Sequence, residues 1–247
     1  ERLVGVFSHP DFNLLYPNGD HVQQWTVCVV ARGTGGTLRA DGGETLHVGW
    51  MAVDETLPQF PPAYQAMVRA ALDSPHEAAL EPAYTRSPLT PYYPILRAHV
   101  GHAPIILPGI MAVVRDGAGR VLAARRRDDD LFDVPGGYCD LGETTTAAAI
   151  REVREETGLE VEPQRVIGVY SQDMRFTYPN GDMVHGVGLA LECRAVGGAL
   201  RADRDEISEV AYLTPEELLA QGVSPGMAGM QALWRDLSRP DTWPVLR

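Results

Sequence analysis

The stretch GGYCDLGETTTAAAIREVREETGL, residues 136–159, decides how this chain is interpreted. Thr144 is a good N-cap, because its side-chain oxygen can accept a hydrogen bond from a free amide in the first turn of a helix. Gly158 suits the left-handed conformation in which many helices end. Together these two signals predict a helix over residues 145–157.

The two faces of this predicted helix differ in chemistry. Ile150 and Val153 fall on one side, and Glu152, Glu155 and Glu156 spread over the opposite side. Like charges at these spacings repel one another by roughly 0.2–0.5 kcal/mol per pair on an isolated helix. A hard divalent cation that takes oxygen ligands, such as Mg²⁺ or Mn²⁺, would convert this repulsion into coordination.

The residues around the helix distinguish a metal site from an ordinary solvated face. A glutamate-rich helix face is most often simply exposed to water. Here, however, Gly136 and Gly137 form a tight loop ahead of the helix, where the backbone can approach a phosphate or a metal closely. Glu143 follows just before the helix, and Arg151 stands beside the glutamates, where it can fix one of them by charge-assisted hydrogen bonds. These flanking residues favour the metal site.

The same stretch resembles the Nudix box, whose pattern is Gly-x5-Glu-x7-Arg-Glu-hydrophobic-x-Glu-Glu-x-Gly-hydrophobic. Every defined position is filled, by Gly137, Glu143, Arg151, Glu152, Val153, Glu155, Glu156, Gly158 and Leu159. The similarity covers about residues 92–237, with a strand at residues 109–114 and the sequence FDVPGG leading into the box. The resemblance implies an α/β fold, a Nudix-type α/β/α sandwich with a mixed sheet between helices.

The resemblance also implies an activity and the roles of individual residues. Nudix proteins are mostly hydrolases that cut the pyrophosphate of a nucleoside diphosphate linked to another group, by attack of water at phosphorus. The implied metal ligands are Glu152, Glu155, Glu156 and the backbone carbonyl of Gly137. Arg151 is implied to orient the glutamates, while Gly136 and Glu143 would support the loop and the metal shell.

The general base stays open at this point. In this family the base is often a glutamate in the loop beyond the central strands, and Glu206 in RADRDEISEV is the best-placed candidate. Glu152 is the alternative, and Glu156 and Arg151 complete the residues expected to act in catalysis. An exposed loop carboxylate without such a role explains Glu206 equally well, because a base must reach the attacking water and the sequence does not show that distance.

Candidate substrate contacts are arginines and aromatic residues. Arg125 and Arg126, with the neighbouring Arg127, could hold a terminal phosphate, although a solvated strand end explains them equally well. The aromatic candidates for stacking on a nucleobase are Tyr178, Tyr170 and Phe176. Aromatic residues in strands belong to the core more often than to a binding site, so stacking is the narrower hypothesis.

The first third of the chain repeats part of the last third. YPNGD occurs at residues 16–20 and 178–182, and the pattern GG-x-LRAD occurs at 35–41 and 197–203, both at an offset of 162. Each copy is predicted to contain a strand, an Asn-Gly hairpin, a second strand, a glycine-rich turn and a third strand. A helical stretch follows, PPAYQAMVRAAL in the first copy and PGMAGMQALWRDL in the second.

This repeat predicts three segments: a partial Nudix-like unit without a box at 1–72, a proline-rich linker at 73–91 and a complete Nudix domain at 92–247. Because the first unit has no carboxylate helix, we expect all hydrolysis to reside in the last segment. The start in mid-repeat without Met favours a tandem pair whose first unit is completed by a preceding segment. The alternative is a first unit that packs against the second domain or a partner chain, since unpaired strand edges invite association, including a homo-oligomer.

Charge and cysteine content limit the partners. With 21 basic and 33 acidic residues, the net charge of −12 argues against broad attraction to long nucleic acid or to an anionic membrane. No apolar run approaches the roughly 20 residues that cross a bilayer. The three cysteines are widely spaced and form no CxxC pair, which predicts reduced thiols and a cytoplasmic location.

The leading hypothesis is therefore a metal-dependent nucleotide pyrophosphohydrolase. The alternative is a non-catalytic nucleotide-binding or regulatory Nudix module, but the complete carboxylate set favours an enzyme. An isomerase on the same fold would need other catalytic residues. The substrate stays open among oxidised nucleotides, ADP-ribose, dinucleoside polyphosphates and RNA 5′ diphosphates, because the same helix serves all of these reactions.

Overall fold

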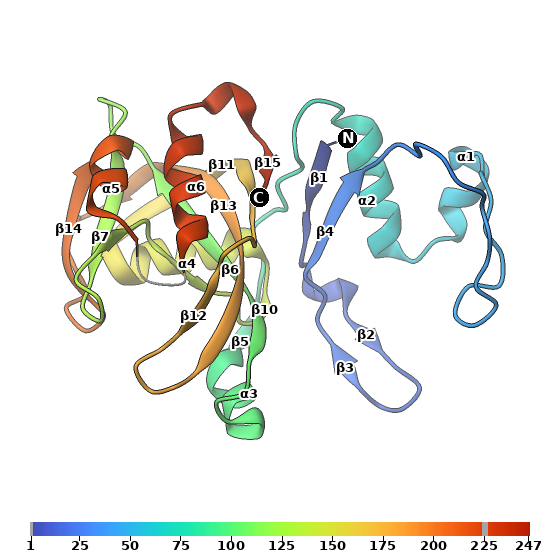
Figure 1. Cartoon of the computed structure of the whole chain (residues 1–247), viewed down its shortest axis with the longest axis horizontal. Coiled ribbons are helices and arrows are strands. Elements are labelled where there is room, and N and C mark those ends of the chain that lie inside the picture. Colours follow the sequence, from blue (N-terminus) through green and yellow to red (C-terminus); the bar gives the residue numbers. More distant parts are fainter. Residues whose placement is uncertain (1, 224–226) are drawn as a thin grey trace.

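A mixed sheet forms the centre of the second half of the chain. The computed structural model describes residues 2–223 and 227–247. The central strands run in the order β15 (Val245–Leu246), β11 (Leu159–Tyr170), β13 (Met183–Gly198), β6 (Ile105–Val114) and β9 (Gly136–Tyr138), and β12 (Arg175–Thr177) pairs with β13 (Figure 1). A second sheet contains β14 (Ile207–Leu213), β7 (Val121–Arg126) and β8 (Phe132–Asp133). Strands β13 and β6 are parallel, whereas β11 and β13 are antiparallel.

Helices cover both faces of the central sheet. Along β6, Ile110 and Ala112 pack in the core cluster that contains helix α4 (Thr145–Thr157). The alternate residues Met111 and Val113 pack in the cluster that contains α5 (Pro215–Gln221) and α6 (Ala228–Leu237). This alternation follows from the two-residue period of a strand. The expected α/β fold with a mixed sheet between helices is confirmed for this part of the chain.

The predicted helix is confirmed at both ends. It begins after Thr144, whose side chain accepts a hydrogen bond from the amide of Ala147 at 3.3 Å. It ends at Gly158, which has a φ of +71° and donates its amide to the carbonyl of Arg154 at 3.0 Å. The two capping residues therefore place the glutamates on one continuous helix.

The first third of the chain forms a smaller sheet and helix. Strand β1 (Arg2–Phe7) pairs antiparallel with β4 (Thr26–Val30), and β2 (Leu14–Leu15) pairs with β3 (His21–Val22) across the Asn-Gly turn. Helix α2 (Pro62–Asp73) packs on β1 through Val4 and Phe7. Shorter helices of this part lie at Pro10–Phe12, Val53–Thr56 (α1) and Leu57–Gln59. One further short helix, Pro240–Thr242, lies near the end of the second half. Strand β1 lies beside β15 of the second half.

The repeat in the sequence is also a repeat in strand register. The opposed pairs are Gly5–Cys28 and Val6–Val27 in the first copy, and Gly168–Ala190 and Val169–Leu189 in the second. Each copy has a parallel pairing at its glycine: Ala79 forms an isolated bridge with Gly5, and Val245 of β15 pairs with Gly168. A Cβ atom at Gly5 would lie 2.9 Å from the carbonyl oxygen of Ala79, so glycine permits this close approach.

One predicted strand of the first copy does not form. Residues 31–52, which follow β4, contain no strand, although the equivalent segment of the second copy forms β14. The reason is that β14 pairs with β7, and the first copy has no counterpart of β7. Its apolar residues therefore stay exposed, with Trp50 87% and Leu46 73% accessible.

The segment expected to be a linker contains secondary structure. Residues Thr85–Thr90 form β5, which pairs with β10 (Leu141–Glu143), and α3 (Tyr92–Val100) follows directly. The strand forms because β10 offers it an edge. The first residues of the predicted helix PGMAGMQALWRDL lie outside the described residues, and α6 is described from Ala228. None of the helices in the described part of the chain is long and apolar enough to cross a membrane.

Candidate active site

Two glutamates of α4 face the glycine loop. Glu156 is 6% exposed, and its carboxylate accepts a hydrogen bond from the amide of Gly136 at 3.2 Å. Glu152 packs against Gly137 so closely that a Cβ atom there would lie 2.7 Å from its carboxyl carbon. A side chain at this position would displace the carboxylate of Glu152, so glycine allows the loop and this carboxylate to lie together. The structure brings these four predicted residues together.

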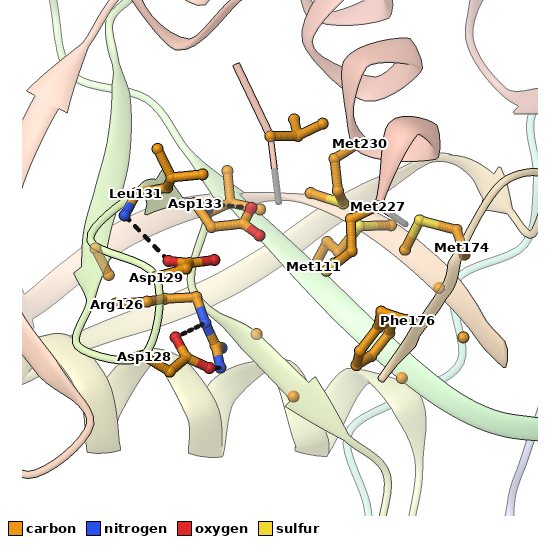
Figure 2. Close-up of a pocket in the computed structure, with 18 of the residues that line it drawn as sticks. Met111, Arg126, Asp128, Asp129, Leu131, Asp133, Met174, Phe176, Met227 and Met230 are labelled. Atoms are coloured by element: carbon orange, nitrogen blue, oxygen red, sulfur yellow. Dashed lines mark hydrogen bonds and ion pairs between the residues drawn. The ribbon is translucent and has the colours of Figure 1, made fainter. Parts of the chain in front are cut away.

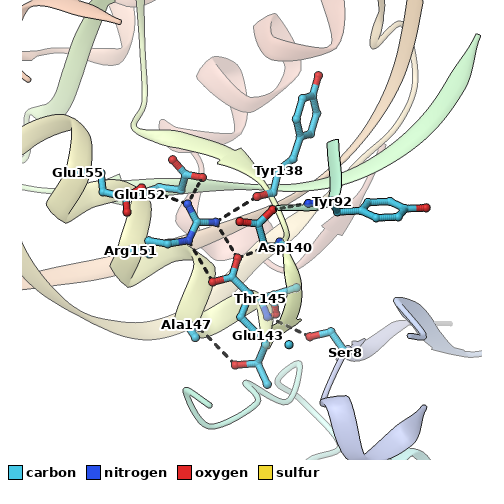
Figure 3. Close-up of polar contacts among 12 residues, drawn as sticks. Ser8, Tyr92, Tyr138, Asp140, Glu143, Thr145, Ala147, Arg151, Glu152 and Glu155 are labelled. Carbon is cyan, nitrogen blue, oxygen red and sulfur yellow. Dashed lines mark hydrogen bonds and ion pairs between the residues drawn. The ribbon is translucent and has the colours of Figure 1, made fainter. Parts of the chain in front are cut away.

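Arg151 connects the remaining predicted residues of the box (Figure 3). Its guanidinium donates to both carboxylate oxygens of Glu143, from Nε at 3.1 Å and from Nη2 at 2.6 Å. Its Nη1 atom donates to Glu152 at 2.7 Å and to Glu155 at 3.2 Å. A further bond from Nη2 reaches the carbonyl of Tyr138 at 3.2 Å. A single arginine thus fixes the loop and the carboxylates relative to one another.

Burial opposes ionisation of the two inward-facing glutamates. Burial raises the pKa of Glu152 to about 7, against the opposing effect of Arg151. Burial, together with the nearby charge of Glu152, raises the pKa of Glu156 well above its usual value. Two carboxylates in this position repel each other unless a proton or a cation neutralises them.

The donor chemistry fits a divalent cation, although the three glutamates do not form a closed site. Among residues 2–223 and 227–247, no group of three or more His, Cys, Asp or Glu side chains is arranged to hold a metal ion. The side chain of Glu155 is 54% exposed and pairs with Arg151. Glu152 and Glu156 supply two close oxygen donors of like charge, which suit a hard cation. The carbonyl of Gly137 lies against β6, where it would be 2.8 Å from a Cβ atom at Gly109.

A pocket opens beside these carboxylates (Figure 2). Its volume is about 340 Å³, within the range of small-molecule sites. Glu156, Gly136 and Gly137 form one side. The apolar side is rich in sulfur and aromatic rings, contributed by Met111, Met174, Phe176, Met227, Met230 and Trp234.

The predicted substrate residues divide into two groups. Arg126 and Tyr178 line the pocket, and each is held in place by a neighbour. Arg126 donates to Asp128 from Nε at 3.0 Å and from Nη2 at 2.7 Å, and the hydroxyls of Tyr178 and Tyr138 are 2.8 Å apart. The carboxylate of Asp128 therefore fixes the orientation of Arg126 beside the pocket.

Arg125 and Tyr170 have other roles in the structure. Arg125 donates to Glu209 at 3.1 Å and lies over the ring of Phe132, with its guanidinium carbon 4.2 Å from the ring centre. Tyr170 is 1% exposed, and its hydroxyl donates to Asp236 at 3.0 Å. Stacking of Tyr170 on a substrate is therefore wrong, because its ring is buried in the core.

Glu206 lies in the exposed loop before β14. Its backbone carbonyl accepts a hydrogen bond from the amide of Arg127 at 2.9 Å, which ties this loop to the end of β7. The negative charge of Glu206 contributes to the raised pKa of Tyr178, although burial is the main cause. Glu206 is thus close to the pocket through Tyr178.

Sequence reasoning missed Asp133 in the pocket. Its carboxylate accepts a hydrogen bond from the amide of Val134 at 2.7 Å, and burial raises its pKa to about 6. Figure 2 shows it between the methionines and Arg126. The available signal was an acidic residue in FDVPGG, placed between apolar residues immediately before the glycine loop.

Comparison with known proteins agrees with this geometry. Residues 106–233 match the family model of the NUDIX domain. The chain is 35% identical over 130 residues to a MutT-like protein from Streptomyces ambofaciens, covering 53% of this chain and 75% of that protein. It is 31% identical over 107 residues to an ADP-ribose pyrophosphatase from Methanocaldococcus jannaschii, covering 42% of this chain and 58% of that protein.

A solved structure is similar to part of the chain. It is the crystal structure of an ADP-ribose pyrophosphatase from Streptococcus suis, with a TM-score of 0.44 and 24% identity, covering 57% of this chain and 97% of that chain. The residues of the family match, 106–233, include the glutamate helix. The chain belongs to the NUDIX domain family.

Proposed function

We propose that this protein hydrolyses the pyrophosphate bond of a nucleoside diphosphate linked to another moiety, with Mg²⁺ or Mn²⁺ bound at helix α4. One observation carries the proposal: Glu152 and Glu156 share a partly desolvated site at the edge of a pocket of about 340 Å³. In their ionised form these two carboxylates would repel a diphosphate, and a bound cation would remove that repulsion.

The proposed metal ligands are Glu152, Glu156, Glu155 and the carbonyl of Gly137. A bound cation would neutralise the diphosphate and make a water molecule a better nucleophile. Arg151 holds Glu152 in place, and the amide of Gly136 holds Glu156. Glu155 would have to leave Arg151 to take part.

The pocket supplies the rest of the proposed site. Its apolar, methionine-rich side suits a nucleobase, and Phe176 presents an aromatic ring there. Arg126 lies on the same pocket as Glu156, where it can contact a phosphate. Glu206 is the proposed general base, since its charge acts on Tyr178 at the pocket, and Glu152 is the alternative.

The substrate class is a small nucleotide. The acidic chain, with a net charge of −12, disfavours long nucleic acid as a substrate. Relatives named as an ADP-ribose pyrophosphatase and a putative 8-oxo-dGTP diphosphatase direct the first choice of compounds. Free thiols at Cys28, Cys139 and Cys193 support a reducing compartment such as the cytoplasm.

The test is a nucleotide panel that includes ADP-ribose and 8-oxo-dGTP. We expect Mg²⁺-dependent release of a nucleoside monophosphate or phosphate, which stops in excess chelator. Glu156→Gln should lower turnover by about two orders of magnitude or more, because it removes a charged oxygen donor while preserving size. Nucleotide binding without any hydrolysis would instead indicate the regulatory module.

A further inference from the structure

The first unit of the chain reaches the loop that leads into α4. Ser8, directly after β1, is 2% exposed, and its Oγ atom accepts a hydrogen bond from the amide of Thr145 at 2.9 Å (Figure 3). Thr145 is the first residue of α4, and its amide has no partner within the helix. A side chain 137 positions earlier in the sequence thus completes the helix N-terminus.

The hydroxyl of Ser8 is oriented for this bond. It donates its single hydrogen to the carboxylate of Glu81 at 2.6 Å, which leaves a lone pair for Thr145. The same carboxylate also accepts from the backbone amides of Ser8 at 2.8 Å and His9 at 3.2 Å. The position of Ser8 is therefore fixed from three directions.

Gln23 holds the other side of the same loop. Its Nε2 atom donates to the carbonyl of Glu143 at 3.1 Å, and its Oε1 atom accepts from the amide of Gly142 at 2.8 Å. The side-chain amide thus uses both its donor and its acceptor on two adjacent residues of the box. Such a two-sided contact specifies position better than a single hydrogen bond.

Glu143 lies between these two anchor points. Its side chain is 1% exposed and binds Arg151 through both oxygens, and Arg151 in turn binds Glu152 at 2.7 Å. A displacement of the loop would therefore move Arg151 and, through it, the proposed metal ligand. Polar groups behind a metal ligand commonly determine its orientation.

The residues that make these contacts have equivalents in the second copy of the internal repeat. Ser8 and Gln23 occupy the positions of Ser171 and His185 in the second copy, where the ring of His185 bonds the carbonyl of Ser171 at 2.8 Å. On strand β1, Leu3 packs in the core cluster that contains α4, and the equivalent residue Val166 of β11 packs in the same cluster. The first unit has no carboxylate helix of its own. Its strand β1 packs instead in the core cluster that contains α4 of the second unit.

We propose that the first unit is a positioning element for the Nudix site, with Ser8 and Gln23 as its positioning residues. They fix the segment from Gly142 to Thr145 and so hold Glu143, Arg151 and Glu152 in register. This inference rests on the proposed function only in that Glu152 binds the metal. It differs from the expectation that all hydrolysis resides in residues 92–247, since it gives the first unit a part in holding the site.

The experiment measures Mn²⁺ binding to the full chain without substrate, by electron paramagnetic resonance of free Mn²⁺. We expect Gln23→Ala to weaken Mn²⁺ binding by up to about tenfold, because Gln23 acts through Glu143 and Arg151 and removal of a direct partner of a ligand costs about 10- to 100-fold. Gln65→Ala is the matched control, because Gln65 is a partly exposed residue of α2 whose side chain is hydrogen-bonded to Phe60 and Arg69 of the first unit. In turnover assays, Gln23→Ala should lower kcat and leave KM near the wild-type value.

Several outcomes decide the proposal. Equal Mn²⁺ affinity in Gln23→Ala and Gln65→Ala would overturn it, even if Gln23→Ala melts at a lower temperature. Ser8→Ala should weaken binding in the same direction, and if that variant does not fold, Gln23→Ala alone decides. If the wild-type protein binds Mn²⁺ but hydrolyses no nucleotide, the proposed function fails while the positioning role is still measured. If the wild-type protein binds no Mn²⁺, both proposals fail.

Discussion

Arg151 donates two hydrogen bonds to the carboxylate of Glu143, at 3.1 and 2.6 Å, and the side chain of Glu143 is 1% exposed. This arrangement ties the loop before α4 to the second turn of that helix. The planar fork of arginine matches the two carboxylate oxygens, and its remaining nitrogen reaches Glu152. A lysine could carry the charge but could not make all of these bonds together.

Arg151→Lys should therefore lower kcat/KM by about 10- to 100-fold, as expected when a partner behind metal ligands is lost. Arg154→Lys is the control, because Arg154 is an exposed residue of the same helix. Steady-state kinetics at saturating Mg²⁺ compare the two variants. Equal losses in both would mean that the contact to Glu143 has no special role.

Glu156→Gln should change the pH dependence of stability in the absence of metal. Burial raises the pKa of Glu156 well above its usual value, so the folded protein keeps a proton that the unfolded chain releases. The stability of the wild-type protein therefore falls as pH rises above about 4.3, the ordinary value for glutamate. Glutamine retains an oxygen for the amide of Gly136 but does not titrate.

In excess chelator, the variant should thus melt at a higher temperature than the wild-type protein at neutral pH, with a difference that shrinks toward acid. Thermal unfolding followed by circular dichroism measures both proteins across the pH range. A difference in melting temperature that stays the same at every pH would show that the ionisation of Glu156 does not change the stability of the folded protein.

Local signals in the sequence determine the part of the site that was predicted. The caps Thr144 and Gly158 and the spacing of the glutamates define α4, because each acts within a few residues of the helix. The side-chain direction of Glu155 could not be predicted, since Arg151 has several acidic neighbours and only the folded geometry selects among them.

Contacts between distant segments explain what the sequence did not reveal. Strand β5 forms in a proline-rich segment because β10 provides an edge, whereas the expected third strand of the first copy lacks a partner. Ser8 and Gln23 carry no pattern that points to a loop 119 or more positions away. Tertiary pairing overrides local propensity in each of these cases.

Metal binding should depend on the ionisation of Glu152. Burial raises the pKa of this carboxyl to about 7, and a ligand carboxylate must lose its proton before it coordinates a cation. The affinity for Mn²⁺ should therefore rise as pH increases through about 7, with release of a proton on binding. Mn²⁺ titrations at several pH values, with proton release followed in weak buffer, test this.

The matched variants for this prediction are Glu152→Gln and Glu160→Gln. Glu152→Gln should bind Mn²⁺ more weakly and lose the step near neutral pH. Glu160 is an exposed residue of β11, so its substitution should leave the pH profile unchanged. A pH step that survives in Glu152→Gln would assign the titration to another group.

Phe176→Ala should weaken substrate binding without disturbing the metal site. Phe176 is half-buried on β12 and lines the pocket, and its ring meets that of Tyr178 edge-on, with the centres 5.0 Å apart. Stacking of a nucleobase on one aromatic ring contributes about 1–3 kcal/mol. KM for a nucleotide substrate should therefore rise roughly tenfold, within that range. The affinity for Mn²⁺ should stay at the wild-type value, because the pocket's apolar side supplies no metal ligand.

Phe60→Ala, at a partly exposed phenylalanine of the first unit outside this pocket, is the control and should leave KM unchanged. An unchanged KM in Phe176→Ala would mean that the nucleobase binds elsewhere, whereas a fall in Mn²⁺ affinity would mean that this ring supports the glutamate helix.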